Sequence, residues 1–302
     1  MAVRLYITCP SYAFRSPAER SKIIWRAQTW ADQLSWDVTI SPLLSRYYPA
    51  GAWLPTEQRA EDLQRALEYD IVWAARGGYA AVHLVPALLQ ADPPRTPLLI
   101  GYSDPTVLHA CWHVRGWAPR LYGTLGDQVN ESRQGESLLQ IFKGQPLQIN
   151  SDSEPAVLVL RPGQAQGHVF AGCLVVLASL CGTPACPDLR GHILMIEDVN
   201  ERPYAIDFAL NQLYLSGALD GVVALVGGSF SSEGDAEYGG PSSEAILAEW
   251  GARLGIPTIA RVPFGHVEDH LVVPCGVTAT FNANANGSWS LAWPELGAFK
   301  LD

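Results

Sequence analysis

The sequence of 302 residues predicts a mixed α/β protein with two domains joined by a linker. Strand-like and helix-like segments alternate through the first half, which is typical of a parallel sheet with crossover helices. A stretch crowded with turn-forming residues interrupts this pattern, and a second mixed α/β pattern follows. The length supports two domains, because single hydrophobic cores stop growing at roughly 250–300 residues.

Short apolar runs and helix-start residues define the elements of the first half. The helix over 55–68 has the clearest pattern, because Pro55 and early acidic residues precede Leu63 and Leu67 on one helical face. The predicted elements are, in order, strand 4–8, helix 16–34, strand 36–41, helix 55–68, strand 71–74 and strand 97–102.

Turn formers and helix breakers gather after the first half of the chain. We therefore predict an N-terminal domain over 1–145, a linker over 146–166 and a C-terminal domain over 167–302. The elements of the second domain follow from its apolar runs and turn residues. They are apolar runs at 168–180 and 192–196, a helix at 203–216, a buried strand at 221–226, a helix at 242–254, and a hairpin of 271–281 and 288–293.

Composition excludes several function classes. The net charge of -10 argues against a nucleic-acid partner, because phosphate backbones are bound by clustered Lys and Arg. No run approaches the roughly 18 apolar residues that a membrane-spanning helix requires, so we expect no membrane partner. Residues 1–10 resemble a first strand more than a signal peptide, and we therefore expect a cytoplasmic protein.

Cysteine usage indicates reduced thiols and no metal centre. The cysteines are scattered through a long chain without an export signal. Cys181 and Cys186 are at the wide margin of the spacing of a zinc knuckle, and no second ligand pair follows them. We interpret all six as small buried side chains and predict neither a metal nor another cofactor. They are Cys9, Cys111, Cys173, Cys181, Cys186 and Cys275.

The first candidate for chemistry is Ser103. The apolar strand that ends near Gly101 stops at polar residues and is followed by a helix. Such a turn exposes a side chain at the carboxyl edge of a sheet, where open α/β sheets bind ligands, so Ser103 is a candidate nucleophile. The G-x-S-x-G pattern of hydrolase elbows is absent. Alternatively, Asp104 and Pro105 form an ordinary helix start and Ser103 is a turn residue.

A pair of glycines, Gly77 and Gly78, also follows a short apolar strand. Backbone amides there can approach a ligand closely and face developing negative charge, as an oxyanion hole requires. The alternative is a tight turn that only needs positive φ, and the two interpretations are compatible. Too few glycines follow for a dinucleotide-binding or phosphate-binding loop.

An acidic cluster follows a predicted strand of the second half. One carboxylate of this cluster can orient a catalytic histidine, as the third member of a triad does. Alternatively, its oxygens bind a divalent cation, or the cluster is a solvated loop before the helix at 203–216. The residues concerned are Glu197, Asp198, Asn200 and Glu201.

Among seven histidines, only His266 sits in a loop flanked by Pro263 and Gly265 and followed by acidic residues. It is the candidate general base, and the alternative is a structural histidine, which is the more usual role of a lone His. His109 falls about two turns into the helix after Ser103, so we expect it to point away from the nucleophile.

Aromatic residues come soon after the predicted nucleophile helix. Trp112, His113 and Trp117 form either an aromatic wall beside the site or part of the core, and the core is the more usual place for Trp.

Together these segments resemble the LD-carboxypeptidase family of serine peptidases, which includes the muramoyltetrapeptide carboxypeptidases and the microcin C self-immunity proteins. The resemblance extends over most of the chain, and the order and spacing of its blocks make it specific. The blocks are QRAEDL at 58–63, ARGGY at 75–79, IGYSD at 100–104, GTP at 182–184, IEDVNERPYAID at 196–207 and FGH at 264–266.

The resemblance implies a catalytic triad. Ser103 would be the nucleophile, His266 the general base and acid, and Glu197 the carboxylate that orients the imidazole. Because the nucleophile and its two partners lie in different halves of the chain, the site is expected between two domains.

The resemblance also implies an oxyanion hole made by the backbone amides of Asp104 and of the Gly77–Gly78 turn. Arg76 and Tyr79, in the same block as the glycines, are expected to contact the substrate.

The fold implied by the resemblance is an N-terminal flavodoxin-like domain followed by a C-terminal swivelling β/α domain, assembled as a homodimer without a cofactor. The implied reaction releases the terminal D-alanine of a murein tetrapeptide during cell-wall recycling. The microcin branch of the family instead implies cleavage of an aminoacyl or peptidyl nucleotide. Ala80 and Pro105, beside the expected site, and the segment 171–173 depart from the family pattern.

Overall fold

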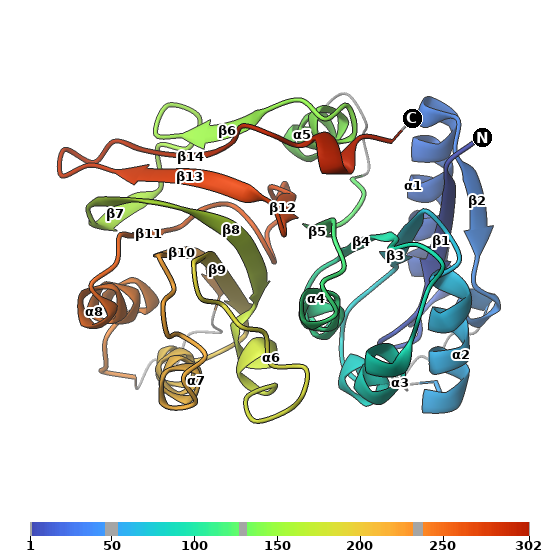
Figure 1. Ribbon diagram of the computed structural model, residues 1–302, viewed down its shortest axis with the longest axis horizontal. Coiled ribbons are helices and arrows are strands. Elements are labelled where there is room, and N and C mark those ends of the chain that lie inside the picture. The colour runs from blue at the N-terminus through green and yellow to red at the C-terminus, as the bar shows by residue number, and fades with distance from the viewer. Residues whose placement is uncertain (1, 46–53, 127–131, 232–237, 302) are drawn as a thin grey trace.

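The computed structural model describes residues 2–45, 54–126, 132–231 and 238–301. Its strands form a six-stranded and an eight-stranded sheet, which lie next to each other with helices around them (Figure 1). The mixed α/β class predicted from the alternation of elements is confirmed.

The first sheet is built mainly from the N-terminal half. Its strands are β1 (Arg4–Thr8), β2 (Asp37–Ile40), β3 (Ile71–Ala74), β4 (Leu98–Gly101), β5 (Arg120–Tyr122) and β12 (Val273–Cys275). They lie in the order β12-β5-β4-β3-β1-β2. The five strands of the N-terminal half are parallel, and their order 2-1-3-4-5 is that of the flavodoxin-like fold. β12 comes from the C-terminal half and pairs antiparallel with β5.

The helices of this half connect the parallel strands. They are α1 (Pro17–Leu34), α2 (Thr56–Ala66), α3 (Val85–Gln90), α4 (Thr106–Val114) and α5 (Arg133–Phe142), with the 3-10 turns η1 (Pro42–Ser45) and η2 (Ala81–Leu84). Ser16 caps α1 by accepting a hydrogen bond from the Glu19 amide. The helices predicted at 16–34 and 55–68 therefore correspond to α1 and α2, whereas the sequence did not predict α3 and α5.

The second sheet contains the remaining strands, which are β6 (Leu147–Asn150), β7 (Leu158–Arg161), β8 (Gly163–Cys173), β9 (His192–Val199), β10 (Ala224–Ser231), β11 (Thr258–Ala260), β13 (Thr278–Ala283) and β14 (Trp289–Trp293). Their order is β6-β14-β13-β8-β9-β10-β11-β7. β8 to β11 are parallel, and the outer strands are antiparallel. β13 and β14 form a hairpin near the C-terminus, as predicted, but the predicted first arm at 271–281 also contains β12, which belongs to the first sheet.

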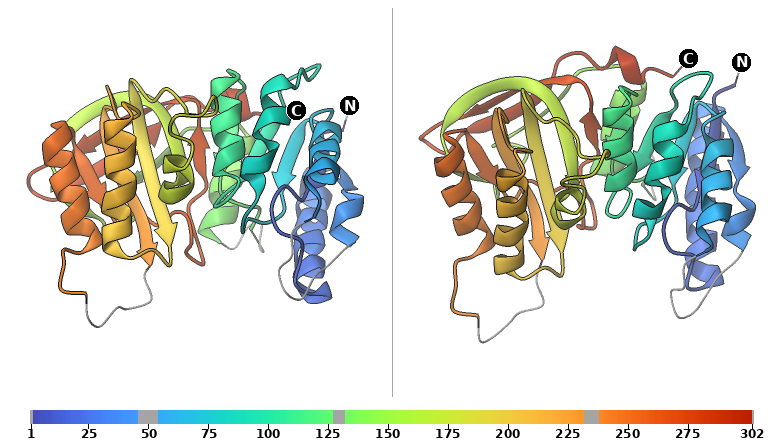
Figure 2. Two further views of the ribbon diagram at one scale, coloured as in Figure 1. Left: turned by 90° about the horizontal axis from the view of Figure 1, so that it is seen from below. Right: turned by 60° about the horizontal axis from the view of Figure 1, so that its bottom comes forward.

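Three helices cover one face of this sheet, α6 (Leu174–Ala178), α7 (Pro203–Leu215) and α8 (Ser243–Leu254), as Figures 1 and 2 show. The last element is the 3-10 turn η3 (Gly297–Phe299). α7 and α8 correspond to the helices predicted at 203–216 and 242–254. Within the predicted apolar run 168–180, the strand β8 gives way to α6.

The turn-rich stretch at 146–166 is not an extended linker without regular structure. It contains β6, β7 and the first residues of β8, all in the second sheet. Its glycines and prolines separate short strands, because turn formers end a strand without preventing the next one. The domain limits at 145 and 167 remain predictions.

The two halves share their packing. Tyr122 of the first sheet belongs to the same buried apolar cluster as Val169 and Phe264 of the second half. The Cys173 amide at the end of β8 donates to Thr106 Oγ1 at the start of α4, at 2.9 Å. This contact fixes the nucleophile-bearing turn against the second sheet.

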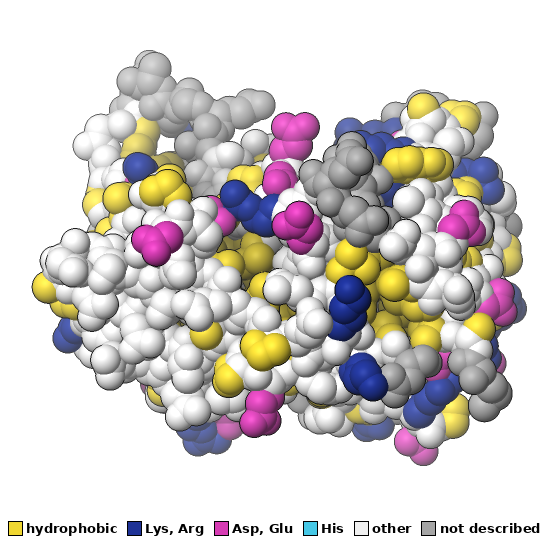
Figure 3. Space-filling model, turned by 90° about the horizontal axis from the view of Figure 1, so that it is seen from above, with side chains coloured by type: hydrophobic (Ala, Val, Ile, Leu, Met, Phe, Trp, Pro, Cys, Tyr) yellow, Lys and Arg dark blue, Asp and Glu magenta, His cyan; other side chains and the backbone are white. Residues whose placement is uncertain are grey.

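Two observations on the described residues concern membranes and surface charge. No helix among them is both long and apolar enough to cross a membrane. On the face shown in Figure 3, Lys and Arg side chains are scattered rather than gathered into one patch.

Candidate active site

Ser103 lies on the turn between β4 and α4. Its backbone has φ of 69°, in the left-handed region that non-glycine residues rarely adopt. The Thr106 amide donates to the Ser103 carbonyl at 2.8 Å and so closes the turn. Strained backbone of this kind is concentrated at functional sites, because the surrounding structure must hold it in place.

Asp104 does not cap α4. Its carboxylate is buried and accepts hydrogen bonds from Ser11 Oγ at 2.6 Å and from the Ala81 amide at 2.9 Å. Burial raises the pKa of Asp104, and these two hydrogen bonds oppose that shift. The side chain therefore ties the nucleophile turn to two other loops of the first half, and its own amide stays on the side of Gly77.

Glu197 and His266 are in direct contact. Glu197 lies in β9 with a side chain that is 0% exposed, and its Oε2 is 2.7 Å from His266 Nδ1. The same oxygen accepts the His266 backbone amide at 3.2 Å. With Nδ1 donating to the carboxylate, the Nε2 atom of the neutral ring is left as a proton acceptor.

Tyr122, at the end of β5, connects this pair to the nucleophile turn. Its hydroxyl donates to Glu197 Oε1 at 2.6 Å and accepts the Ser103 amide at 3.1 Å. Burial and the neighbouring carboxylate raise the pKa of Tyr122 well above its ordinary value, so the hydroxyl keeps its proton. A continuous chain of hydrogen bonds thus runs from the Ser103 backbone through Tyr122 and Glu197 to His266.

Sequence reasoning missed Tyr122. The only signal for it is its position at the carboxyl end of a strand adjacent to β4, opposite Gly101 in the register. Nothing local in the sequence around it indicates a contact with Glu197.

A cavity of about 360 Å³ opens onto Ser103 and His266. Its wall also contains Tyr102, whose ring centroid is 5.3 Å from that of His266. Among the described residues, no hydrogen bond joins Ser103 Oγ to the His266 ring. The structure therefore places Ser103 and His266 on one cavity, with the buried Glu197 carboxylate behind the ring. Catalytic hydrogen bonds are often long in the absence of substrate and tighten when it binds.

The glycine turn lies against the nucleophile. A Cβ atom on Gly77 would be 2.9 Å from Ser103 Cβ and 3.4 Å from the Asp104 nitrogen, so only glycine permits this approach. Gly78 has φ of 117°, and a Cβ atom there would be 2.6 Å from the Tyr12 ring. The backbone of this turn and the Asp104 amide are thus placed beside Ser103, as an anion-stabilising pocket requires.

Arg76 and Tyr79, both expected to contact the substrate, are in different environments. Arg76 lines the cavity, where its Nη1 donates to the Ala13 carbonyl at 2.8 Å and pairs with Glu19 at 3.1 Å. Tyr79 is 44% exposed, packs edge-on against Tyr12 and does not line this cavity. The next residue, Ala80, has φ of 100°, a conformation in which glycine is favoured.

Comparison with known proteins shows the family of the chain. The model of the LD-carboxypeptidase N-terminal domain matches residues 5–123, and that of the C-terminal domain matches residues 166–281. The murein tetrapeptide carboxypeptidase of Pseudomonas aeruginosa is 34% identical over 80% of this chain and 81% of its own length. The chain belongs to the LD-carboxypeptidase family.

Solved structures show the same fold. The muramoyltetrapeptide carboxypeptidase from Oxalobacter formigenes has a TM-score of 0.77 at 25% identity, covering 95% of this chain and 98% of its own. The microcin C7 self immunity protein in complex with aspartyl sulfamoyl adenosine has a TM-score of 0.73 at 19% identity, covering 97% of each chain. Both family branches therefore share the architecture of this LD-carboxypeptidase.

The first two residues of the acidic cluster, Glu197 and Asp198, lie within β9 rather than after it. Asp198 accepts hydrogen bonds from the amides of Val175 and Val199, at 2.8 and 2.9 Å, and from Cys173 Sγ at 3.3 Å. Burial raises the pKa of Asp198 to about 6. In the described part of the chain, no three His, Cys, Asp or Glu side chains are grouped in a way that could hold a metal ion. The oxygens of Glu197 and Asp198 are thus used within the protein.

The helix after the nucleophile supplies core rather than catalytic groups. His109 Nε2 is 2.8 Å from the Gly101 carbonyl, and burial lowers the pKa of His109 to about 3, so the ring is neutral at physiological pH. Trp112 and Trp117 are buried and pack edge-to-face with centroids 5.1 Å apart. They form part of the core and not a wall of the cavity.

Of the six thiols, only Cys181 and Cys186 are partly exposed.

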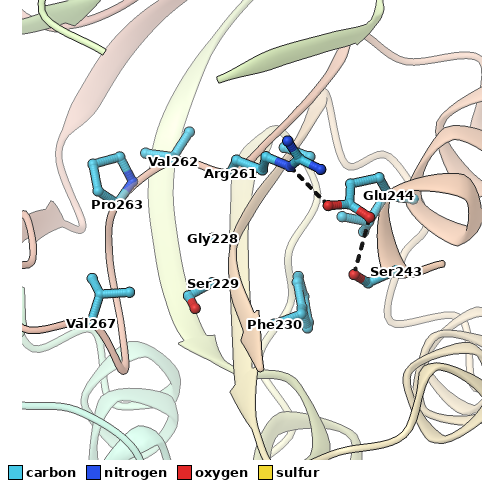
Figure 4. Close-up of a pocket in the computed structure, with 11 residues that line it drawn as sticks. Gly228, Ser229, Phe230, Ser243, Glu244, Arg261, Val262, Pro263 and Val267 are labelled. Carbon is cyan, nitrogen blue, oxygen red and sulfur yellow. Dashed lines mark hydrogen bonds and ion pairs between the residues drawn. The ribbon is translucent and has the colours of Figure 1, made fainter. Parts of the chain in front are cut away.

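A second cavity, of about 320 Å³, lies at the carboxyl ends of β10 and β11 beside the start of α8 (Figure 4). Its polar wall holds the ion pair of Arg261 and Glu244, at 2.9 Å. Pro263 and Val267 contribute from the loop that carries His266. Neither Ser103 nor the His266 ring lines this cavity, so the cavity next to Ser103 is the candidate active site.

Replacing Gly265 by alanine should destabilise this LD-carboxypeptidase by roughly 2–5 kcal/mol, because overpacking and left-handed strain add together. Gly265 has φ of 87°, and a Cβ atom would lie 2.3 Å from Glu197 Cδ. Gly287 is a matched control, since its φ is 89° and no atom lies within 4 Å of its Cβ position. Urea unfolding should give Gly287→Ala a loss of only about 1–2 kcal/mol. Equal losses in the two variants would show that Glu197 does not constrain the loop.

Proposed function

We propose that this LD-carboxypeptidase is a serine enzyme that releases the terminal D-alanine of murein tetrapeptide with a Ser103, His266 and Glu197 triad. The observation that carries this proposal is the buried Glu197 carboxylate at 2.7 Å from Nδ1 of His266, a residue that lines the same cavity as Ser103. The name of the Pseudomonas aeruginosa relative supports the substrate.

The proposed mechanism begins with attack of Ser103 Oγ on the carbonyl carbon of the last peptide bond. His266 Nε2 takes the hydroxyl proton, and Glu197 holds the ring in orientation and stabilises the imidazolium that forms. His266 then gives the proton to the departing amine, which leaves an acyl-enzyme on Ser103. A water molecule, deprotonated by His266, hydrolyses this ester and restores the enzyme.

The oxyanion of both tetrahedral intermediates would be bound by backbone amides. The Ser103 amide is already used by the Tyr122 hydroxyl, which leaves the Asp104 amide and the Gly77–Gly78 turn as donors. Donors of this kind are fixed before the reaction begins, so they stabilise developing charge without reorganisation.

The test measures D-alanine release from murein tetrapeptide beside turnover of aspartyl sulfamoyl adenosine. We expect D-alanine release with a kcat/KM at least 100-fold above that for the nucleotide. Covalent labelling of Ser103 by a serine-directed phosphonate, located by peptide mass mapping, should accompany it. Faster turnover of the nucleotide would assign the chain to the microcin-type reaction, and loss of activity on chelation would overturn the serine mechanism.

The proposal also includes a cytoplasmic location and the homodimer that the resemblance implies. Muropeptides produced during wall recycling would be the substrates in that compartment. Sedimentation at micromolar concentration distinguishes a dimer from a monomer directly.

A further inference from the structure

Helix α1 contributes two cationic side chains to the wall of the active-site cavity. Lys22 and Arg26 are four residues apart, so they lie one above the other on one face of the helix. Both line the same cavity as Ser103 and His266. Tyr102 is part of the same wall. Burial and the Glu197 carboxylate raise the pKa of Tyr102, and the positive charge of Arg26 opposes that shift. Arg26 is therefore close enough to act on groups of this wall electrostatically.

The described lining of this cavity is positive although the chain as a whole is acidic. Its charged side chains are Lys22, Arg26 and Arg76 against the single carboxylate of Glu19. Glu19 forms an ion pair with Arg76 at 3.1 Å. The chain carries a net charge of -10, so the positive lining is a local feature that favours an anion beside the nucleophile.

Arg76, the third cation of the lining, is held by contacts within the protein. Its Nη1 atom donates to the Ala13 carbonyl and contacts Glu19, and its side chain is 16% exposed. These contacts hold the start of α1 against the Gly77–Gly78 turn. Arg76 therefore positions α1 and with it the face that carries Lys22 and Arg26.

A carboxypeptidase substrate brings an anion to this place. In the proposed reaction the bond that breaks joins the last residue to the chain, so the terminal carboxylate lies only about one residue length, roughly 4 Å, from the scissile carbonyl. When that carbonyl meets Ser103, the carboxylate must be in the same cavity. A guanidinium can bind a carboxylate through two hydrogen bonds, and an ammonium adds a point charge on a flexible stem.

We propose that Lys22 and Arg26 bind the terminal carboxylate of the residue that is released, and that this contact restricts cleavage to the last peptide bond. The inference rests on the proposed function, since it assigns the leaving residue to that cavity. It predicts that the enzyme distinguishes a free terminal carboxylate from a terminal amide.

The test compares three peptides: murein tetrapeptide, the same peptide ending in D-alaninamide, and the peptide with only its internal carboxylates amidated. The variants are Lys22→Gln, Arg26→Gln, the double variant, and Arg65→Gln as a control on an exposed position of α2 that does not line the cavity. Loss of charged hydrogen bonds should raise KM for the free acid about 10- to 100-fold in the double variant, with a smaller change in kcat.

The decisive readout is the preference for the peptide with a free terminal carboxylate over the peptide with a terminal amide. Wild type and Arg65→Gln should prefer the free acid to the terminal amide, and the double variant should process the two alike. Retained discrimination in the double variant overturns the proposal. If the effect of the double variant instead vanishes with the internally amidated peptide, the two cations bind an internal carboxylate, which also overturns it.

Binding to Ser103→Ala protein separates this inference from the proposed reaction, because it needs no turnover. Calorimetry with the free acid and the terminal amide, with and without the Lys22 and Arg26 substitutions, should reproduce the same discrimination. If wild type releases no D-alanine but this pattern is found, the reaction is wrong and the carboxylate site stands. Equal binding of acid and amide overturns the site, whether or not the enzyme is active.

Discussion

Replacing Ser103 by alanine should lower kcat for D-alanine release by about 10⁴- to 10⁶-fold, the range expected when a serine peptidase loses its nucleophile. The oxyanion donors are backbone groups and remain in place, so a residual rate above that of the uncatalysed reaction should persist. Single-turnover assays with enzyme in excess measure this residual rate. KM should change little, because the hydroxyl contributes mainly to the transition state.

The fold should tolerate this substitution. The turn is held by the Ser103 backbone, through the Thr106 amide and the Tyr122 hydroxyl, and the substitution leaves both contacts in place. Ser229→Ala is the matched control, because Ser229 lines the second cavity. If Ser229→Ala loses activity and Ser103→Ala keeps it, the reaction takes place in the other cavity.

Replacing Glu197 by glutamine should lower kcat by about 10²- to 10⁴-fold. Glutamine keeps the size of the side chain and removes the charge that stabilises the imidazolium. The carboxylate accepts a hydrogen bond from Tyr122 on one oxygen and from His266 on the other. In glutamine one of these two oxygens is replaced by an NH₂ group, which donates and cannot accept, so one of the two hydrogen bonds is lost. The ring is therefore less well oriented as well as less stabilised. Steady-state kinetics measure the loss.

Glu244→Gln provides the control for charge removal, because Glu244 is the carboxylate of the second cavity and pairs with Arg261. Its kcat should stay within about twofold of wild type, since surface ion pairs contribute little. Unfolding curves for both variants identify any part of the loss that comes from instability. A Glu197→Gln enzyme with full kcat and normal stability would remove Glu197 from the triad.

Local sequence patterns were sufficient to predict several of the elements and the residue types of the site. The strand, turn and helix around Ser103, the helix α2 and the C-terminal hairpin follow from apolar periodicity and turn residues, which act over a few neighbouring positions. The ordered family blocks then indicated Ser103, Glu197 and His266 as candidates for one triad. No single one of these residues carries that information, because each also fits an ordinary turn, acidic loop or surface histidine.

How these segments meet depends on contacts that no local pattern encodes. Tyr122 and Glu197 are 75 positions apart, and their hydrogen bond depends on two sheets packing at a fixed angle and register. The same holds for the pairing of β12 with β5 and for the strands formed within the turn-rich stretch at 146–166. The sequence did not indicate a role for Lys22, because a cation on an amphipathic helix has the same local pattern as a solvated surface residue. Its place in the cavity wall follows from the packing of α1 against the rest of the protein. Local propensity has a short range, whereas an active site is built from contacts between distant segments.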